Sequence, residues 1–381
     1  MGITGIICEY NPLHLGHRKQ LDMIRARFPG EGIVCLMSGN FVQRGKPAIF
    51  DKMVRAKAAL LCGADLVLEL PVTGALSSAE GFAGVGVEIL GGFCHRLCFG
   101  TESGNEESLL ATAQALLSPG FTQMLKQELE KGASFPAARQ AALETLGVGG
   151  GLLAMPNDIL AVEYCKAILS QKSQMKPMTI LRQGSYHDTA PDPENPSATA
   201  VRKLMAEDSC WEAFVPEEVR DLFAGAAVHT LEMGERAILA KLRTMTDNEF
   251  EALPYGSEGL WRKFMHACRR EATLEGILTA TKSKRYTRTR LDRMAMCAFL
   301  GITREMLEMP TPYARVLALN DRGREILKAA RGVGAFPNIG EKVDHPYQTL
   351  ETRCGQLYGL FTNGAPDPPE AESQYRVFYQ P

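Results

Sequence analysis

Residues 5–21 read GIICEYNPLHLGHRKQL, and this stretch decides how the fold is interpreted. Residues 5–8 form a short apolar run, as expected of a strand buried in a parallel sheet. An Asn-Pro turn follows, and His14, Gly16 and His17 stand where a helix is expected to begin. The stretch therefore predicts a buried strand, a tight turn and a helix, with two histidines at the junction.

Short apolar runs of the same kind recur along the first part of the chain. They read GIVCLMS at 32–38, ADLVLELP at 64–71 and HRLCFGTE at 95–102. The segments 18–28, 51–62 and 78–90 between them have apolar residues at the three- and four-residue spacing typical of helices. This alternation predicts a doubly wound, parallel α/β sheet, in which ligands bind where the carboxyl ends of the strands meet the N-termini of the helices.

The HLGH motif falls at the first such junction. A helix N-terminus has unpaired N–H groups and a partial positive charge, and Gly16 has no side chain to block a phosphate. Because His14 and His17 lie on one face of the first turn, both can hydrogen-bond the phosphates of a nucleoside triphosphate. The motif therefore favours nucleotidyl transfer, while a surface histidine pair or half of a metal site stay open as alternatives.

Other nucleotide-binding patterns are disfavoured. The first strand is not followed by GxGxxG, and the chain contains no GxxxxGK[ST]. The ten cysteines are scattered and none forms a CxxC pair, which argues against a disulfide framework and a zinc site.

The 381 residues, 45% hydrophobic and 23% charged with a net charge of −2, are typical of a globular chain of two or three domains. With no long apolar run and no leader-like N-terminus, we expect a cytoplasmic location.

The chain from residue 206 to 309 has a helical spacing of Leu, Met, Ala and Phe. Within it, KSKRYTRTRLDR at 282–293 concentrates six cations against one acid, Asp292: Lys282, Lys284, Arg285, Arg288, Arg290 and Arg293. Such a cluster suits an RNA phosphate backbone, and Tyr286 could stack on an unpaired base. A solvated run of charges is the alternative.

Several motifs together carry a family resemblance. HxGH after the first strand resembles the nucleotidyltransferase superfamily, which has a HUP-like fold and includes the class I aminoacyl-tRNA synthetases. Longer matches are CEYNPLHLGH at 8–17, SGNFVQRGKPAIFDK at 38–52, CFGTE at 98–102, PNDILAVEY at 156–164, SYHD at 185–188, SATAVRK at 197–203, KSKRYTRTRLDRM at 282–294 and RVLALNDRGREIL at 315–327. Over most of its length the chain is similar to the bacterial tRNA(Met) cytidine acetate ligase family.

The resemblance implies a ligase that uses ATP to activate acetate as acetyladenylate. It then acetylates N4 of the wobble cytidine of elongator tRNA(Met), giving N4-acetylcytidine without acetyl-CoA. Mg²⁺ is expected with ATP on chemical grounds, and no protein ligand for it is predicted; neither DNA nor a membrane is an expected partner. The alternatives are an adenylyltransferase or carboxylate-adenylating ligase acting on a small metabolite, and an RNA-binding protein that has lost catalysis.

The sequence pattern, taken together with this resemblance, also predicts a division into domains. Residues 1–205 would form the nucleotidyltransferase-like domain that binds ATP and acetate, and residues 206–309 a basic helical domain that binds tRNA. Residues 310–364 would form a small C-terminal α/β unit, with a β-like segment at 314–320 before a helix. Residues 365–381, rich in proline and acid, are expected to be a disordered tail.

Carried over position by position, the family's catalytic and ATP-binding residues fall on defined positions of this chain. His14 and His17 are the implied catalytic pair. The implied ATP contacts are Ile7, Cys8, Glu9, Tyr10, Asn11, Pro12, Leu13, His14, Leu15, Gly16, His17, Arg18, Lys19, Gln20, Gly100, Asn157, Arg182 and Gln183. The chain reads RQG at 182–184 where the family usually has Arg-Ile-Gly, so it departs from the pattern at Gln183.

Three of these positions have an ordinary structural explanation as well as a chemical reason to contact ATP. Gly100 ends a strand and lets backbone approach the adenine or ribose, or simply makes a tight turn. Asn157 follows a proline at a helix start, where asparagine is a common N-cap. Arg182 closes an apolar strand and can clamp a phosphate, or be an exposed edge charge.

Two further segments lie at the predicted binding edge. Ser197, Thr199 and Arg202 begin a helix and resemble a second phosphate-binding motif, although a plain cap explains them almost as well. The loop at 38–52 is glycine-rich and polar and can close over ATP. Within it, Arg44 is the candidate contact of the acetate carboxylate.

Overall fold

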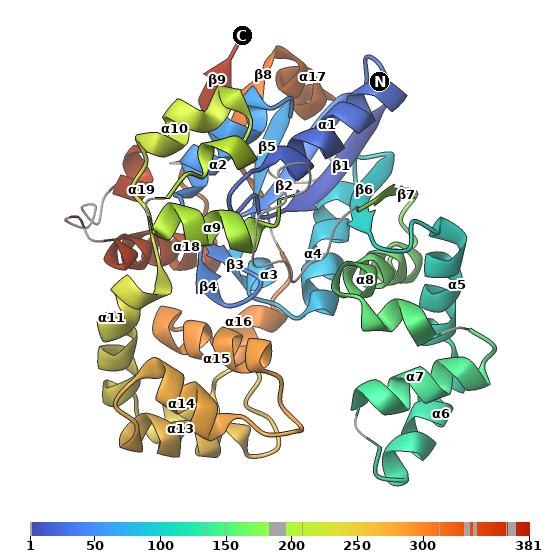
Figure 1. Cartoon of the computed structure of the whole chain (residues 1–381), viewed down its shortest axis with the longest axis vertical. Helices are drawn as coiled ribbons and strands as arrows, with labels where there is room; N and C mark the ends of the chain where they lie inside the picture. The colour runs from blue at the N-terminus through green and yellow to red at the C-terminus, as the bar shows by residue number, and fades with distance from the viewer. Residues whose placement is uncertain are drawn as a thin grey trace.

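A seven-stranded sheet organises the molecule (Figure 1). The computed structural model describes residues 2–133, 135–148, 150–182, 196–207, 209–311, 313–330, 336–337, 341–362, 364 and 371–381. The strands are β1 (Ile3–Cys8), β2 (Gly32–Ser38), β5 (Leu66–Leu70), β6 (Arg96–Thr101), β7 (Lys176–Leu181), β8 (Arg315–Asn320) and β9 (Phe378–Gln380), in the order β7-β6-β1-β2-β5-β8-β9. The first five in sequence are mutually parallel, and β8 runs antiparallel to β5.

Helices cover both faces of this sheet, which confirms the doubly wound α/β prediction. Helices α1 (Leu15–Arg27), α2 (Lys52–Leu61), α9 (Ala198–Ala206) and α10 (Arg220–Ala224) share a core with one face. Helices α4 (Ala79–Gly91), α5 (Glu106–Leu117), α8 (Pro156–Ser170) and α17 (Asp321–Ala329) share a core with the other. All residues of β1 and β2 are buried, because both sides of the central strands are covered.

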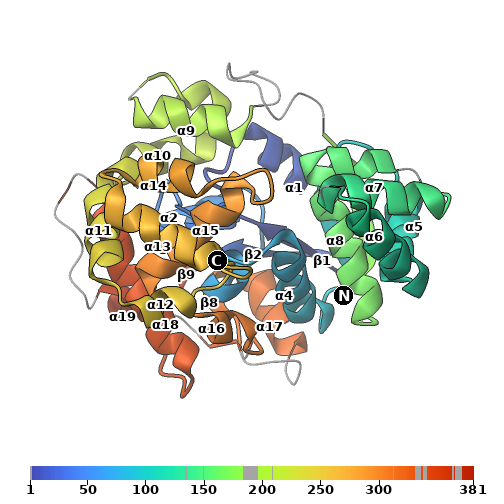
Figure 2. The same cartoon turned by 90° about the horizontal axis from the view of Figure 1, so that it is seen from below.

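Two helical regions extend from the sheet. Between β6 and β7 the chain forms α5, α6 (Pro119–Glu130), α7 (Phe135–Thr145), a 3₁₀ turn (Gly150–Ala154) and α8. After α10 it forms α11 (Leu231–Thr244), α12 (Asp247–Glu251), α13 (Leu260–Arg270), α14 (Leu274–Thr281), α15 (Arg288–Leu300) and α16 (Arg304–Glu308). Seen from below, α5–α8 lie on one side and α11–α15 on the other (Figure 2).

The second helical region is joined to the sheet by a shared core. Its apolar side chains pack with those of α3 (Val72–Ala75), α18 (Pro346–Tyr358) and the hairpin of β3 (Phe41–Val42) and β4 (Lys46–Pro47). The turn of that hairpin has Gly45 at φ 71°, and a Cβ there would lie 2.5 Å from the amide nitrogen of Arg293 in α15. Only glycine fits this contact, so the turn packs directly against the backbone of α15.

The C-terminal residues take part in the main sheet. Residues 310–364, which the sequence places in a small unit of its own, supply β8, since an apolar strand is stabilised by pairing with an existing sheet edge. The segment 365–381 is expected to be a disordered tail. Its described part, 371–381, instead contains α19 (Ala371–Gln374) and β9, which pairs with β8.

Charged side chains are buried together beside β5. Lys52 lies 3.0 Å from Glu69, Arg315 lies 2.7 Å from Glu69, and both cations also bind Glu372; none of these side chains is more than 5% exposed. Glu351 accepts the amide of Val72, and burial together with nearby Glu69 raises its pKa to about 7. This network ties α2, β5, β8, α18 and α19 together.

Within the described ranges, no helix is both long enough and apolar enough to cross a membrane.

Candidate active site

A buried arginine fixes the carboxyl ends of the two central strands. The Arg55 side chain, on α2, is fully buried and donates to the carbonyls of Glu9, Ser38, Gly39 and Phe50. Buried carbonyls at strand ends need donors, and Arg55 supplies them for β1 and β2 at once. This role of Arg55 is not visible in the sequence, because an arginine in a helix gives no signal of burial.

The chain turns sharply after β1. Tyr10 is buried with φ 43°, and the Asn11–Pro12 peptide is cis. The Asn11 side chain accepts the amide of Ile49, which holds the turn against the loop that precedes α2. This turn brings His14 to the N-cap of α1.

His14 and His17 form a reciprocal cap at the start of α1. Nδ1 of His14 accepts the amide of Gly16 at 3.1 Å, and Nδ1 of His17 accepts the amide of His14 at 3.3 Å. The two rings stack with centroids 3.8 Å apart. The pair therefore occupies the positions that Ser/Thr and Glu/Gln take in a capping box.

These hydrogen bonds determine the chemistry of both rings. Burial lowers the pKa of His17 to about 3, with a further contribution from Arg182, and lowers the pKa of His14 well below its ordinary value. Both imidazoles are thus neutral at pH 7. Since each Nδ1 accepts a backbone N–H, the proton of each neutral ring lies on Nε2, which makes both histidines hydrogen-bond donors through Nε2.

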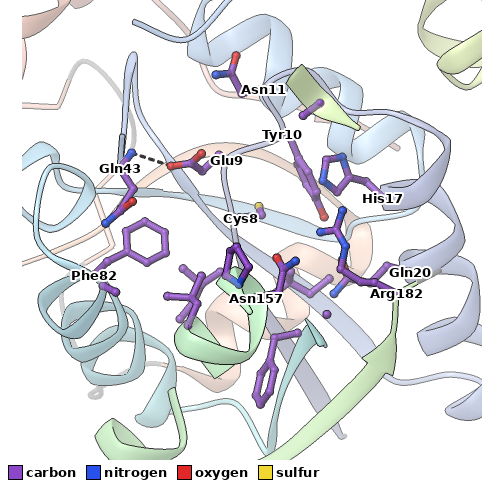
Figure 3. Close-up of a pocket in the computed structure, with 18 of the residues that line it drawn as sticks. Cys8, Glu9, Tyr10, Asn11, His17, Gln20, Gln43, Phe82, Asn157 and Arg182 are labelled. Carbon is purple, nitrogen blue, oxygen red and sulfur yellow. Dashed lines mark hydrogen bonds between the residues drawn. The ribbon is translucent and has the colours of Figure 1, made fainter. Parts of the chain in front are cut away.

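A cavity of about 300 Å³ opens at the carboxyl ends of β1 and β6 (Figure 3). It is lined by most of the implied ATP contacts: Ile7, Cys8, Glu9, Tyr10, Asn11, His17, Gln20, Gly100, Asn157 and Arg182. An adjoining pocket of about 90 Å³ is lined by His14, Gly16, His17, Lys19, Gln20, Gly100 and Arg182. The structure thus brings together residues from β1, α1, β6, α8 and the end of β7.

Other implied ATP contacts lie elsewhere. Pro12, Leu13, Leu15 and Arg18 line neither cavity. Leu13 is fully buried in the core, and Arg18 pairs with Asp22 and Glu218. Gln183 falls outside the described residues, as does the SYHD motif.

Asn157 is not an N-cap, which corrects the ordinary interpretation of this position. Met155 is the N-cap of α8, and the Asn157 amide group donates to Glu102 Oε1 at 2.6 Å. The Glu102 carboxylate also accepts the backbone amides of Asn157 and Asp158, so it caps the helix from outside. Glu102 was missed as a site residue, although the acid of GTE directly after a strand is a visible signal.

Gly100 leaves room for the side chain of Arg182. A Cβ at this position would lie 3.0 Å from Cδ of Arg182, so the glycine lets the Arg182 side chain lie across the end of β6. Arg182 is held by its backbone amide, which donates to Thr101 at 2.8 Å. The guanidinium is therefore placed beside His17 by two neighbouring strands (Figure 3).

The loop 38–52 contributes the opposite wall. It is not a plain loop, because β3 and β4 pair within it. Glu9 accepts the backbone amide of Gln43 at 2.7 Å, and Gln43 and Arg44 both line the cavity. Arg202, on α9, donates to the Asn11 carbonyl and to Thr199, while Ser197 caps α9.

The six basic residues of 282–293 differ in exposure. Lys282, Lys284 and Arg285 are exposed, and Arg285 pairs with Glu258. Arg288 pairs with Glu275 and Asp292, Arg290 donates to the carbonyl of Tyr255, and Arg293 is buried with its guanidinium 5.0 Å from the Tyr255 ring. Tyr286 donates to Glu258. Acids distant in the sequence thus offset part of the charge, which the local composition does not reveal.

No group of three or more His, Cys, Asp or Glu side chains able to hold a metal ion occurs in the described part of the chain.

Comparison with known proteins identifies the family. A family model described as HIGH Nucleotidyl Transferase matches residues 1–372. The chain is 35% identical to the tRNA(Met) cytidine acetate ligase of Clostridium acetobutylicum, over 94% of this chain and 96% of that protein. The chain belongs to the tRNA(Met) cytidine acetate ligase family. The enzyme of that name from Clostridium tetani is 37% identical, with the same coverage.

Solved structures agree with this membership in the tRNA(Met) cytidine acetate ligase family. The crystal structure of Thermotoga maritima TmcAL without ligand matches with a TM-score of 0.90 and 31% identity, over 100% of this chain and 99% of that one. The structure of the same protein bound with alpha-thio ATP matches with a TM-score of 0.87 and the same coverage. Family and fold therefore agree over the whole length.

Proposed function

We propose that this protein activates acetate with ATP and transfers the acetyl group to N4 of the wobble cytidine of elongator tRNA(Met). The observation that carries the proposal is the neutral histidine pair at the N-terminus of α1, whose Nδ1 atoms accept backbone amides and whose Nε2–H groups are left as donors; His17 lines the cavity of about 300 Å³ at the sheet edge, and both histidines line the pocket that adjoins it. The names of the curated relatives and the ATP analogue in the Thermotoga maritima protein support the substrates.

In the first step, an oxygen of acetate attacks the α-phosphorus of ATP. The new O–P bond gives acetyladenylate, and the bond to the β-phosphate breaks so that pyrophosphate leaves with the electron pair. His14 and His17 donate from Nε2 to the phosphate oxygens, and Arg182 supplies a positive charge beside them. Donors fixed by the fold stabilise the charge that develops in this displacement without reorganising.

ATP is placed by the same residues. The triphosphate lies at the α1 N-terminus, and the base and ribose lie toward Gly100 and Asn157, which Glu102 holds in position. Mg²⁺ would be held by phosphates and water, as is usual for nucleotide complexes, and it would offset phosphate charge. Arg44, on the opposite wall, is the proposed contact of the acetate carboxylate.

The basic surface places the tRNA. Lys282, Lys284 and Arg285 are exposed and precede α15, and the hairpin that carries Gln43 and Arg44 is seated on that helix through Gly45. This surface is proposed to bind the anticodon arm while the hairpin borders the cavity. The exposed cations attract phosphates, and the wobble base enters the cavity in a single-stranded state.

The test uses purified protein with ATP, labelled acetate and unmodified elongator tRNA(Met), with no acetyl-CoA. We expect acetate-dependent exchange of pyrophosphate into ATP and labelled N4-acetylcytidine in the digested RNA. A His14→Ala/His17→Ala double variant should lose the exchange and keep its affinity for tRNA. Turnover that needs no RNA and leaves RNA unlabelled would favour a small-metabolite substrate instead.

A further inference from the structure

We infer that Glu9 is the general base that accepts the N4 proton of cytidine when the acetyl group is transferred. The inference rests on the proposed function, because it assigns a residue to the second step of that reaction. It starts from a chemical requirement: an exocyclic amine must lose a proton to become an amide. A base within hydrogen-bond reach of that amine speeds such a step by about 10²–10⁴.

The cavity has two different ends. His17, Gln20 and Arg182 lie on one side, and Glu9, Gln43 and Phe82 lie on the other (Figure 3). The first side has the N-terminus of α1 with the Nε2–H donor of His17, which suits a triphosphate. The acyl carbon and the incoming amine therefore belong toward the second side, where Glu9 lies.

Glu9 is the one carboxylate among the described residues that line this cavity. His17 cannot serve as the base, since its Nδ1 accepts the amide of His14 and its Nε2 carries the proton. Burial raises the pKa of Tyr164 well above its ordinary value, so its hydroxyl stays protonated. Glu102 accepts the backbone amide of Asp158 at the start of α8, and Asp158 in turn accepts the backbone amides of Glu102 and Ser103 after β6.

The surroundings of Glu9 suit this role. Its Oε1 accepts the amide of Gln43 at 2.7 Å, which orients the carboxylate. The charged and titratable groups around it are Arg44 from the hairpin, Arg55 from α2, Arg202 from α9 and Tyr164 from α8. Burial raises the pKa of Glu9 above its ordinary value despite the three guanidinium groups, and a raised pKa makes a carboxylate a stronger base.

The step balances without a further reactant. The N4 lone pair attacks the carbonyl carbon of acetyladenylate and forms the C–N bond. The bond from that carbon to the phosphate oxygen breaks, and AMP leaves with the electron pair. The N4 proton passes to Glu9, which returns it to solvent. A carboxylate is also the usual protein acceptor for the cytosine N4 amine, so the same group can position the base before reaction.

Glu9→Gln is the central test, because an amide oxygen can still accept the Gln43 amide while basicity is lost. We expect acetate-dependent pyrophosphate exchange to be retained and to fall far less than acetyl transfer does, since a base is not needed to form acetyladenylate. Single-turnover acetyl transfer to tRNA should fall by about 100-fold or more. In the wild type this rate should rise as Glu9 ionises with increasing pH, and the variant should lose that dependence.

Two further variants separate catalysis from structure. Asp22→Asn, an exposed carboxylate-to-amide change on α1, should leave both steps unchanged. Glu9→Ala removes the hydrogen bond to Gln43 as well, and it should weaken exchange more than Glu9→Gln does. The inference is overturned if Glu9→Gln keeps wild-type transfer, or if it loses exchange and transfer together. If the wild-type protein catalyses acetate-dependent pyrophosphate exchange but never labels tRNA, the result contradicts tRNA as the acetyl acceptor and not the assignment of Glu9.

Discussion

Replacing His17 by Gln tests the neutral histidine cap. A glutamine at this position keeps an acceptor for the His14 amide, as in an ordinary capping box, but it cannot titrate. Burial lowers the pKa of His17 to about 3, against about 6.5 in an unfolded chain. Between these values the unfolded state binds a proton that the folded state does not. The free energy of unfolding therefore falls as the pH drops below about 6.5.

The size of the effect follows from the two pKa values. At pH 7.5 both states are unprotonated and the contribution of His17 is close to zero. At pH 5.5, one unit below the unfolded pKa, it reaches up to about 1.4 kcal/mol, and it grows by about as much for each further unit until the folded state titrates as well. Between pH 7.5 and 5.5, the free energy of unfolding of the wild type should therefore fall by up to about 1.4 kcal/mol more than that of His17→Gln.

Urea denaturation at pH 7.5, 6.5 and 5.5 measures this difference, with the slope m compared between the two proteins to check that the unfolded states match. His266→Gln, which changes an exposed histidine on α13, is the matched control, and its profile should parallel that of the wild type. Equal pH dependence in wild type and His17→Gln would refute the conclusion that His17 is kept neutral by the fold.

Three other variants probe different parts of the molecule. Lys52→Met leaves Glu69 with one cation fewer in the buried network, and chemical denaturation should show a loss of about 3–5 kcal/mol. Glu102→Gln removes the charge that caps α8, so the KM for ATP should rise several-fold, whereas unchanged ATP kinetics would contradict its positioning role. Lys282→Gln/Lys284→Gln should weaken tRNA binding and lower the slope of log affinity against log salt by about 1.5; an unchanged slope would place the RNA elsewhere.

The regular elements of the sheet could be predicted because local patterns determine them. The expected strands at 5–8, 32–38 and 64–71 and helices at 18–28, 51–62 and 78–90 agree with β1, β2, β5, α1, α2 and α4 within a few residues. Each is apolar enough, or periodic enough, for its burial to be visible in the sequence. The HLGH junction was found for the same reason, since it directly follows a buried strand.

What the sequence could not provide depends on contacts between distant residues. Arg55 holds the site in place through hydrogen bonds to backbone carbonyls that no local pattern reveals, and the position of Glu102 after a strand is visible in the sequence whereas its bonds to the start of α8 are not. The pairing of β8 with β5 joins residues far apart in the chain, and three short segments, β3, β4 and β9, are too brief to give a periodic signal. The neutrality of the histidine pair likewise comes from burial, which composition does not report.

The central claim is that this chain joins acetate to tRNA at the expense of ATP. The most direct measurement incubates the protein with ATP, labelled acetate and unmodified elongator tRNA(Met), followed by digestion of the RNA and separation of its nucleosides. Labelled N4-acetylcytidine at the wobble position, dependent on ATP and formed without acetyl-CoA, is the predicted result. ATP cleavage with no labelled nucleoside in the RNA would contradict it.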